Sequence, residues 1–170
     1  MAEKGIVLMP CAPKYPKQIL ASWDVLKKLR EDGYLTGLMM VMLGGIKGLN
    51  ENIAEQAASL MPLKYEYVNA PLVVMLSCVP IEDIDFLHFP HTAIEYVTHG
   101  IEFARSLPLG GRRIVSFHLN SLVSHEEFKK HSAEAWRERF SEIADSLSLL
   151  TDYARLLGVE IVVESVPAPE

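Results

Sequence analysis

The stretch Leu149–Glu164, LLTDYARLLGVEIVVE, contains the end of an amphipathic helix, a glycine and a short apolar strand. The helical pattern begins upstream, and its apolar positions follow one another at gaps of 4, 3, 4, 3, 4 and 3. Such spacing places one apolar stripe along a helix. The members of the stripe are Trp136, Phe140, Ile143, Leu147, Leu150, Ala154 and Leu157. Gly158 is suited to end the helix, and Val159–Val163 has the apolar content of a buried strand. The stretch therefore predicts one helix followed by one strand of an α/β fold.

The same alternation of strand and helix runs back through the chain. The earlier apolar runs that we predict as strands are Ile6–Met9, Leu38–Leu43, Tyr65–Val68 and Ile114–Phe117. Three helices are predicted between them. The first begins near Pro16, the second begins at Asn50, and the third carries Ile94, Val97, Ile101 and Ala104. The segment Ala70–Ile81 is predicted as a long apolar loop, and Ser124 and Glu127 have the spacing of a capping box. Alternation of this kind predicts parallel strands joined by helical crossovers.

Two parallel α/β architectures fit this order of elements. One is a (β/α)8 TIM-type barrel, of which about five βα units would be present. The alternative is an open doubly wound parallel sheet. A complete barrel takes about 250 residues, whereas this chain has 170, a length that suits one domain. On the barrel interpretation, residues 1–170 form a single domain that is truncated at its carboxyl end.

The composition is that of an ordinary globular protein. Hydrophobic residues make up 49% of the chain, charged residues 22%, and the net charge is −6. Disordered chains have a lower apolar content, and proteins that coat nucleic acid carry a basic surface, so both classes are disfavoured. No apolar run approaches the roughly 20 residues of a membrane span. The two cysteines, Cys11 and Cys78, are too few for a disulfide framework, which favours a cytoplasmic location.

Two predicted strands are followed directly by metal-ligand side chains. Glu164 follows Val159–Val163, and His118 follows Ile114–Phe117. Functional groups of parallel α/β folds gather at these carboxyl ends, and a carboxylate beside a buried strand is costly unless it is paired or binds a cation. The alternatives are a salt bridge from Glu164 to a neighbouring strand end, and a core histidine bonded to a backbone carbonyl. Equivalent positions on successive strands favour a shared cation, and imidazole with carboxylate suits zinc or manganese.

Three further polar residues follow predicted strands and are candidates for substrate binding. Lys47 lies in the segment GGIKG, whose backbone N–H groups and ammonium suit a phosphate, although a plain turn is the simpler explanation. Asn69 follows the third predicted strand, and Asn120 follows the fourth. His88 and His91 have His-x-x-His spacing, but no second half of a metal motif follows, so we predict a surface loop there.

Three motifs in chain order carry a family resemblance. They are Asn69–Ser77 (NAPLVVMLS), Ile114–Ser121 (IVSFHLNS) and Leu149–Pro167. The first resembles the third-strand His-Ala-Pro loop of the xylose isomerase-like TIM-barrel superfamily, which includes sugar-phosphate isomerases and epimerases and endonuclease IV-type enzymes. The second resembles the fourth-strand His-Pro-Gly-Ser motif of that superfamily, and the third resembles the helix and strand that lead into its glutamate ligand. The resemblance extends over most of the chain and implies a barrel that continues with three more strands.

The resemblance implies that His118 and Glu164 are metal ligands and that Glu164 also acts in catalysis, beside the reacting carbons of a sugar. Two positions depart from the superfamily. Asn69 stands where the first zinc-binding histidine is expected, and Leu43–Gly45 stands where many isomerase members carry a second-strand glutamate. An amide oxygen is a weak zinc ligand, so a three-zinc site is not expected.

Three functions are compatible with these residues. The first is a sugar or sugar-phosphate isomerase or epimerase that depends on Mn, Zn, Mg or Co and transfers a proton through a metal-stabilised enediolate. The second is an endonuclease IV-like phosphodiesterase acting at abasic DNA sites, which the Asn69–Ser77 segment favours. The third is a barrel fragment without catalysis. The acidic charge and the missing histidine favour the first, so the expected partner is a small sugar or sugar phosphate; no membrane partner is expected, and a homo-oligomer is left open.

Overall fold

The computed structural model describes residues 6–8, 32, 35–42, 71–76, 84–107, 111–119 and 129–164. These residues form five strands and two long helices in the order β1 (Ile6–Leu8), β2 (Leu35–Met42), β3 (Leu72–Leu76), α4 (Pro90–Ser106), β4 (Arg113–His118), α6 (Ala133–Leu156) and β5 (Val159–Glu164). Each pair of neighbouring strands is parallel. The predicted α/β class is therefore confirmed.

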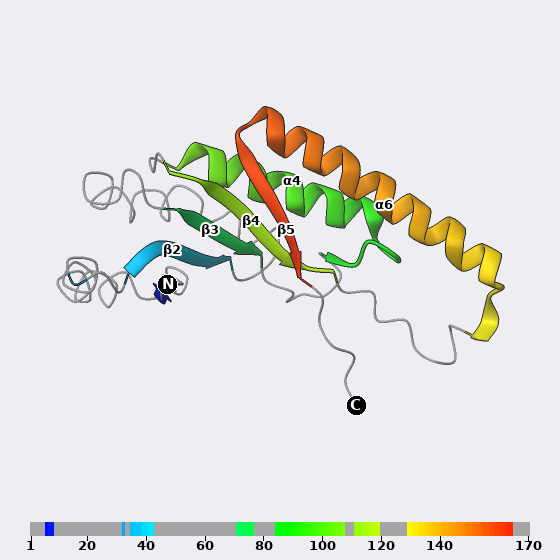
Figure 1. The fold of residues 1–170 in the computed structure, drawn as a ribbon. Helices are drawn as coiled ribbons and strands as arrows, with labels where there is room; N and C mark the ends of the chain where they lie inside the picture. The colour runs from blue at the N-terminus through cyan, green and yellow to red at the C-terminus, as the bar shows by residue number, and fades with distance from the viewer. Residues whose placement is uncertain are drawn as a thin grey trace, which may run out of the picture.

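The strands lie side by side in the order in which they occur along the chain, from β1 to β5 (Figure 1). A doubly wound sheet reverses its strand order part-way across, at the point where ligands bind. The described sheet has no such reversal, so it departs from the open doubly wound alternative. Consecutive order is the arrangement found in singly wound sheets, which include the TIM barrel.

Both described helices cover the same face of the sheet (Figure 1). Helix α4 packs on β3, β4 and β5, while α6 packs on β5 and on α4. The approach of α4 to the sheet is close, because a Cβ atom added at Gly100 would lie only 2.8 Å from Leu76 Cδ2. The side chain of Leu76 therefore points toward the helices. The core between the two layers consists of buried apolar side chains, each of which stabilises the fold by roughly 1.5–3 kcal/mol when fully buried. Its largest fully buried side chains are Tyr96, Phe103, Phe117, Leu72, Leu76 and Ile84.

The apolar stripe predicted for the last helix is largely the buried face of α6. Its buried members are Trp136, Ile143, Leu150 and Ala154. Phe140 departs from the prediction, because it is 48% exposed and stacks on Trp136 with ring centroids 5.8 Å apart. The helix begins after Ser132, whose Oγ accepts a hydrogen bond from the backbone N–H of Ala135 at 3.2 Å. No helix in the described part of the chain combines the length and apolar character needed to cross a bilayer.

The third strand of the sheet does not lie where the sequence pattern placed it. Strand β3 is Leu72–Leu76, which falls inside the segment Ala70–Ile81 predicted as a loop. Its alternate residues Leu72, Val74 and Leu76 are buried, since they face the helices while their neighbours face away. A continuous apolar run of this kind is typical of a strand covered on its faces, and the prediction of a loop was wrong for these five residues.

Several other predicted elements lie outside the described residues. They are the strand Tyr65–Val68, the helices that begin near Pro16 and at Asn50, and the capping box of Ser124 and Glu127. The remaining predicted strands agree with β1, β2, β4 and β5 to within a few residues at each end. The burial predicted for the fifth strand was wrong at its carboxyl end, because Val162 and Val163 are each 41% exposed.

Substitution of Gly158 tests the turn that joins α6 to β5. Its φ is +69°, the left-handed region that side chains with a Cβ rarely adopt, and an added Cβ there would meet nothing within 4 Å. The cost of substitution therefore comes from the backbone alone. We expect Gly158→Ala to lower the free energy of unfolding by about 1–2 kcal/mol, and Gly158→Asn to lower it less, because asparagine tolerates this conformation. Urea unfolding of the two variants is the measurement, and equal losses would contradict the backbone explanation.

Candidate functional site

His118 and Glu164 end adjacent strands and lie directly opposite one another. The register of β4 and β5 pairs His118 with Glu164, and the ladder extends one step further through a bond from Leu119 N–H to the carbonyl of Glu164 at 3.2 Å. The imidazole Nε2 of His118 lies 3.3 Å from Oε2 of Glu164. The structure therefore brings these two side chains together at neighbouring carboxyl ends.

The pair lies on the face of the sheet that the described helices do not cover. Residues in register on parallel strands share a face, and successive residues alternate between faces. Leu76 points toward α4 and is in register with Phe117, so Phe117 shares the helical face. His118 and its partner Glu164, one residue further along each strand, therefore lie on the opposite face.

A third polar residue, Ser116, completes the cluster. It shares the face of His118 because it lies two residues earlier on β4, and only 2% of its surface is exposed. Its hydroxyl donates a hydrogen bond to Oε1 of Glu164. The Glu164 carboxylate is thus engaged through both oxygens, by Ser116 at one and by His118 at the other. The side chains of His118 and Glu164 are 25% and 42% exposed, so the cluster is open to solvent on one side.

The order of the three groups bears on the chemistry that they can perform. In a serine hydrolase, the histidine lies between the serine and the carboxylate and takes the proton of the hydroxyl. In this protein the carboxylate lies between Ser116 and His118. The hydroxyl therefore donates to Glu164 rather than to an imidazole base, and this geometry does not activate Ser116 as a nucleophile.

The separation of the two donor atoms is compatible with a shared metal ion. Two ligands that are each about 2.0–2.1 Å from one tetrahedral ion lie roughly 3.3–3.4 Å apart, which matches the 3.3 Å between His118 Nε2 and Glu164 Oε2. Catalytic zinc usually has three protein ligands, whereas no group of three or more His, Cys, Asp or Glu side chains that could hold a metal occurs among the described residues. The same contact also satisfies the simpler alternative of a salt bridge between strand ends, when His118 is protonated.

The other three predicted site residues, Lys47, Asn69 and Asn120, lie outside the described residues. Asn69 was chosen because it follows the predicted strand Tyr65–Val68, which also lies outside the described residues. In the sequence it precedes β3 by three positions.

Ser116 was missed in the sequence because it lies inside an apolar run and does not follow one. The signal that could have found it is the period of two along a strand, which places residues 116 and 118 on one face. A serine two positions before a histidine in such a strand therefore lies on the same face as that histidine.

The His-x-x-His pair belongs to the turn that leads into α4. Asp85 is buried, and its Oδ1 accepts hydrogen bonds from the backbone N–H groups of Leu87 and His88, at 3.0 and 3.1 Å. Its Oδ2 lies 2.6 Å from Nδ1 of His88. His91 is exposed in the first turn of α4. His88 is thus an exposed turn residue, as a surface loop implies, whereas the loop prediction was wrong for His91, which lies on the surface of a helix.

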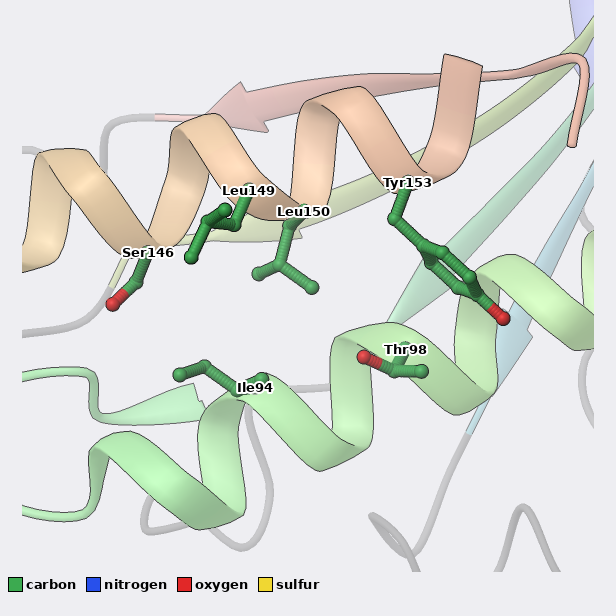
Figure 2. A pocket seen from close by; sticks show the side chains of 6 residues that line it. All are labelled: Ile94, Thr98, Ser146, Leu149, Leu150 and Tyr153. Carbon is green, nitrogen blue, oxygen red and sulfur yellow. The ribbon is translucent and has the colours of Figure 1, made fainter. Parts of the chain in front are cut away.

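A shallow groove of about 250 Å³ lies between α4 and α6 (Figure 2). Its lining residues are Ile94, Thr98, Ser146, Leu149, Leu150 and Tyr153. All of them belong to the two helices, so the groove lies on the outer layer, on the far side of the sheet from His118 and Glu164. It is not a part of the candidate site.

Comparisons of the chain with models of known protein families, with curated proteins and with solved structures gave no match.

A second ion pair, at the amino end of the same two strands, gives a test of how β4 and β5 are paired. Arg112 donates two hydrogen bonds to the carboxylate of Glu160, from Nε at 2.6 Å and from Nη2 at 2.5 Å. The hydrogen bond from Arg112, and then its charge, lower the pKa of Glu160, and the same contacts raise the pKa of Arg112. Because the folded pKa of Glu160 is lowered, its contribution to stability is present above the unfolded value of about 4.3. It is lost as the pH falls through the folded pKa.

We expect Arg112→Gln to raise the pKa of Glu160 toward its ordinary range, because the guanidinium that favours the carboxylate is removed. Arg112→Lys keeps the charge but loses the bidentate hydrogen bonding, so the pKa of Glu160 in this variant should be intermediate. The measurement is the NMR titration of the Glu160 carboxyl carbon in the three proteins. An unchanged titration in Arg112→Gln would contradict the pairing at this end of the strands.

Proposed function

We propose that the protein is a divalent-metal-dependent sugar or sugar-phosphate isomerase or epimerase. The observation that carries the proposal is the 3.3 Å approach of the His118 imidazole to the Glu164 carboxylate, at the carboxyl ends of consecutive parallel strands. That end of the strands is where α/β folds bind substrates. Imidazole and carboxylate are together a ligand set for zinc and manganese.

A (β/α)8-type barrel is the architecture that we propose for this site. Three features of the described residues support it: the consecutive order of parallel strands, the position of α4 and α6 on a single face, and the position of the polar cluster on the other face. In a barrel the helices lie outside, and the face opposite to them lines the interior where the active site opens at the top. The motifs Ile114–Ser121 and Leu149–Pro167, which resemble the xylose isomerase-like superfamily, contain the same two residues.

The roles of the side chains follow from their chemistry. His118 and Glu164 would hold the cation, whose contribution when bound is Lewis acidity toward the oxygens of a sugar. A carboxylate can also act as a base, so Glu164 could accept a proton from the carbon beside a sugar carbonyl. In isomerisation that proton would return to the former carbonyl carbon, while the proton of the neighbouring hydroxyl would pass to the former carbonyl oxygen. Epimerisation would need a second proton-transfer group on the opposite face of the sugar carbon. His118 can donate a hydrogen bond to a substrate hydroxyl.

The abasic-site nuclease is the weaker alternative. Its main support was the segment Asn69–Ser77 as the loop after the third strand, and most of that segment is β3 itself. The net charge of −6 also disfavours a DNA backbone as substrate.

The proposal predicts that Glu164→Gln removes binding of Mn²⁺ or Zn²⁺. We expect an affinity loss of more than about 100-fold, because the change removes a ligand and exceeds the 10–100-fold loss typical of an outer-shell partner. The fold should be retained, since the side chain is 42% exposed. Isothermal titration calorimetry of the full chain with each metal is the measurement.

Glu160→Gln is the matched control for this prediction. Glu160 lies on the same strand and the same face as Glu164, but it pairs with Arg112 at the amino end. Its removal should leave metal affinity unchanged. The metal-loaded protein is then assayed in parallel for sugar isomerisation, ketose epimerisation and nicking of abasic DNA. Equal metal affinity in wild type and Glu164→Gln overturns the ligand assignment, and nicking without isomerisation or epimerisation reverses the order of the two enzyme functions.

A further inference from the structure

We infer that Ser116 is a positioning residue that holds the Glu164 carboxylate in one orientation, so that Oε2 faces His118. This inference deepens the function proposed above and rests on it where a cation is concerned. The hydroxyl of Ser116 donates to Oε1 of Glu164, while Oε2 lies 3.3 Å from His118 Nε2. The two contacts together distinguish the two oxygens of the carboxylate.

The fixed end of this arrangement is Ser116. It is almost fully buried, with 2% of its surface exposed. A serine side chain has few rotamers, and its backbone is bound in the ladders of β4 with both β3 and β5. Its hydroxyl therefore has a well-defined position from which to donate. A buried hydroxyl also needs a partner, because leaving it without one costs about 1–3 kcal/mol.

The mobile end is Glu164. It is the last residue of β5, its side chain is 42% exposed, and a glutamate has three rotatable bonds. Without a donor at Oε1, the carboxylate would exchange between rotamers and would present either oxygen to His118. The register explains why Ser116 can prevent this. Ser116 is opposite Val162, and Glu164 lies two residues further along on the same face, within reach across the strands.

The inference assigns Ser116 a role that differs from the roles of its neighbours. His118 and Glu164 contact the cation or substrate, whereas Ser116 acts only through Glu164. Hydrogen-bond partners that orient metal ligands usually change metal affinity by 10–100-fold when they are removed. Removal of the Ser116 hydroxyl should therefore lower metal affinity less than Glu164→Gln does, and more than removal of a serine hydroxyl elsewhere in the fold.

The test uses the full chain with Ser116→Ala, Ser116→Thr and Ser106→Ala. Threonine keeps the hydroxyl and suits a strand. Ser106 is the control, because its hydroxyl bonds to the carbonyl of Phe103 at the end of α4, in a different part of the fold. The first measurement is made without metal and follows the side-chain scalar couplings of Glu164 by NMR, which report how many rotamers it populates. The second is calorimetry with Mn²⁺.

We expect one dominant Glu164 rotamer in the wild type and in Ser106→Ala, averaged couplings in Ser116→Ala, and recovery of the single rotamer in Ser116→Thr. Mn²⁺ affinity should fall 10–100-fold in Ser116→Ala and recover in Ser116→Thr.

Unchanged couplings in Ser116→Ala overturn the inference. If the wild type binds Mn²⁺, averaged couplings in Ser116→Ala without any loss of Mn²⁺ affinity in that variant also overturn it. A wild type that binds no metal refutes the proposed function instead, and the couplings then decide the role of Ser116 by themselves. If Ser116→Ala fails to fold, averaged couplings in a folded Ser116→Thr overturn the inference, and a single rotamer there supports it.

Discussion

The backbone pairing of β4 with β5 is the constraint on which the candidate site depends. Parallel ladders fix both the neighbours and the faces of every residue, and a shift by one residue would move a whole set of side chains to the other face. In the observed register His118 is opposite Glu164, and Ser116 lies on the same face, two residues before His118 on β4. The bond from Leu119 N–H to the Glu164 carbonyl keeps this pairing intact to the last residue of β5. The three polar side chains meet because the ladder continues to the end of both strands.

The two faces of the sheet have different chemistry, and this difference separates stability from function. On one face, apolar side chains such as Leu76, Val115 and Phe117 are buried under α4 and α6. On the other face, the carboxyl ends of β4 and β5 carry Ser116, His118 and Glu164. Changes on the helical face therefore act on the free energy of unfolding, whereas changes at the polar cluster also alter the orientation and charge of its three side chains. The ion pair of Arg112 with Glu160 lies at the amino end, where it supports the pairing of the strands without touching the cluster.

The arrangement of the elements narrows the possible folds in a way that composition could not. Both a doubly wound sheet and a barrel alternate strands with helices, so periodicity cannot distinguish them. Strand order can, because a doubly wound sheet reverses and a barrel does not. In the described part of the chain, β1 to β5 follow one another in consecutive order, and the two described helices, α4 and α6, lie on one face. The misplaced third strand has a related cause: a buried apolar run such as Leu72–Leu76 lacks the alternation that marks a half-exposed strand, so its neighbours in the sheet have to identify it.

The sequence by itself determined the α/β class, the helix that became α6, its end at Gly158, and the two strand ends that carry His118 and Glu164. Those features are local, since they depend on apolar spacing, on glycine's tolerance of a positive φ and on which residue follows an apolar run. Only the tertiary structure decided the strand order, the true third strand, and the 3.3 Å contact between His118 and Glu164. Only the tertiary structure also revealed Ser116 as their partner. These features depend on the register between strands that are distant in the sequence. Ser116 and Glu164, for example, are 48 residues apart, and no local pattern encodes their pairing.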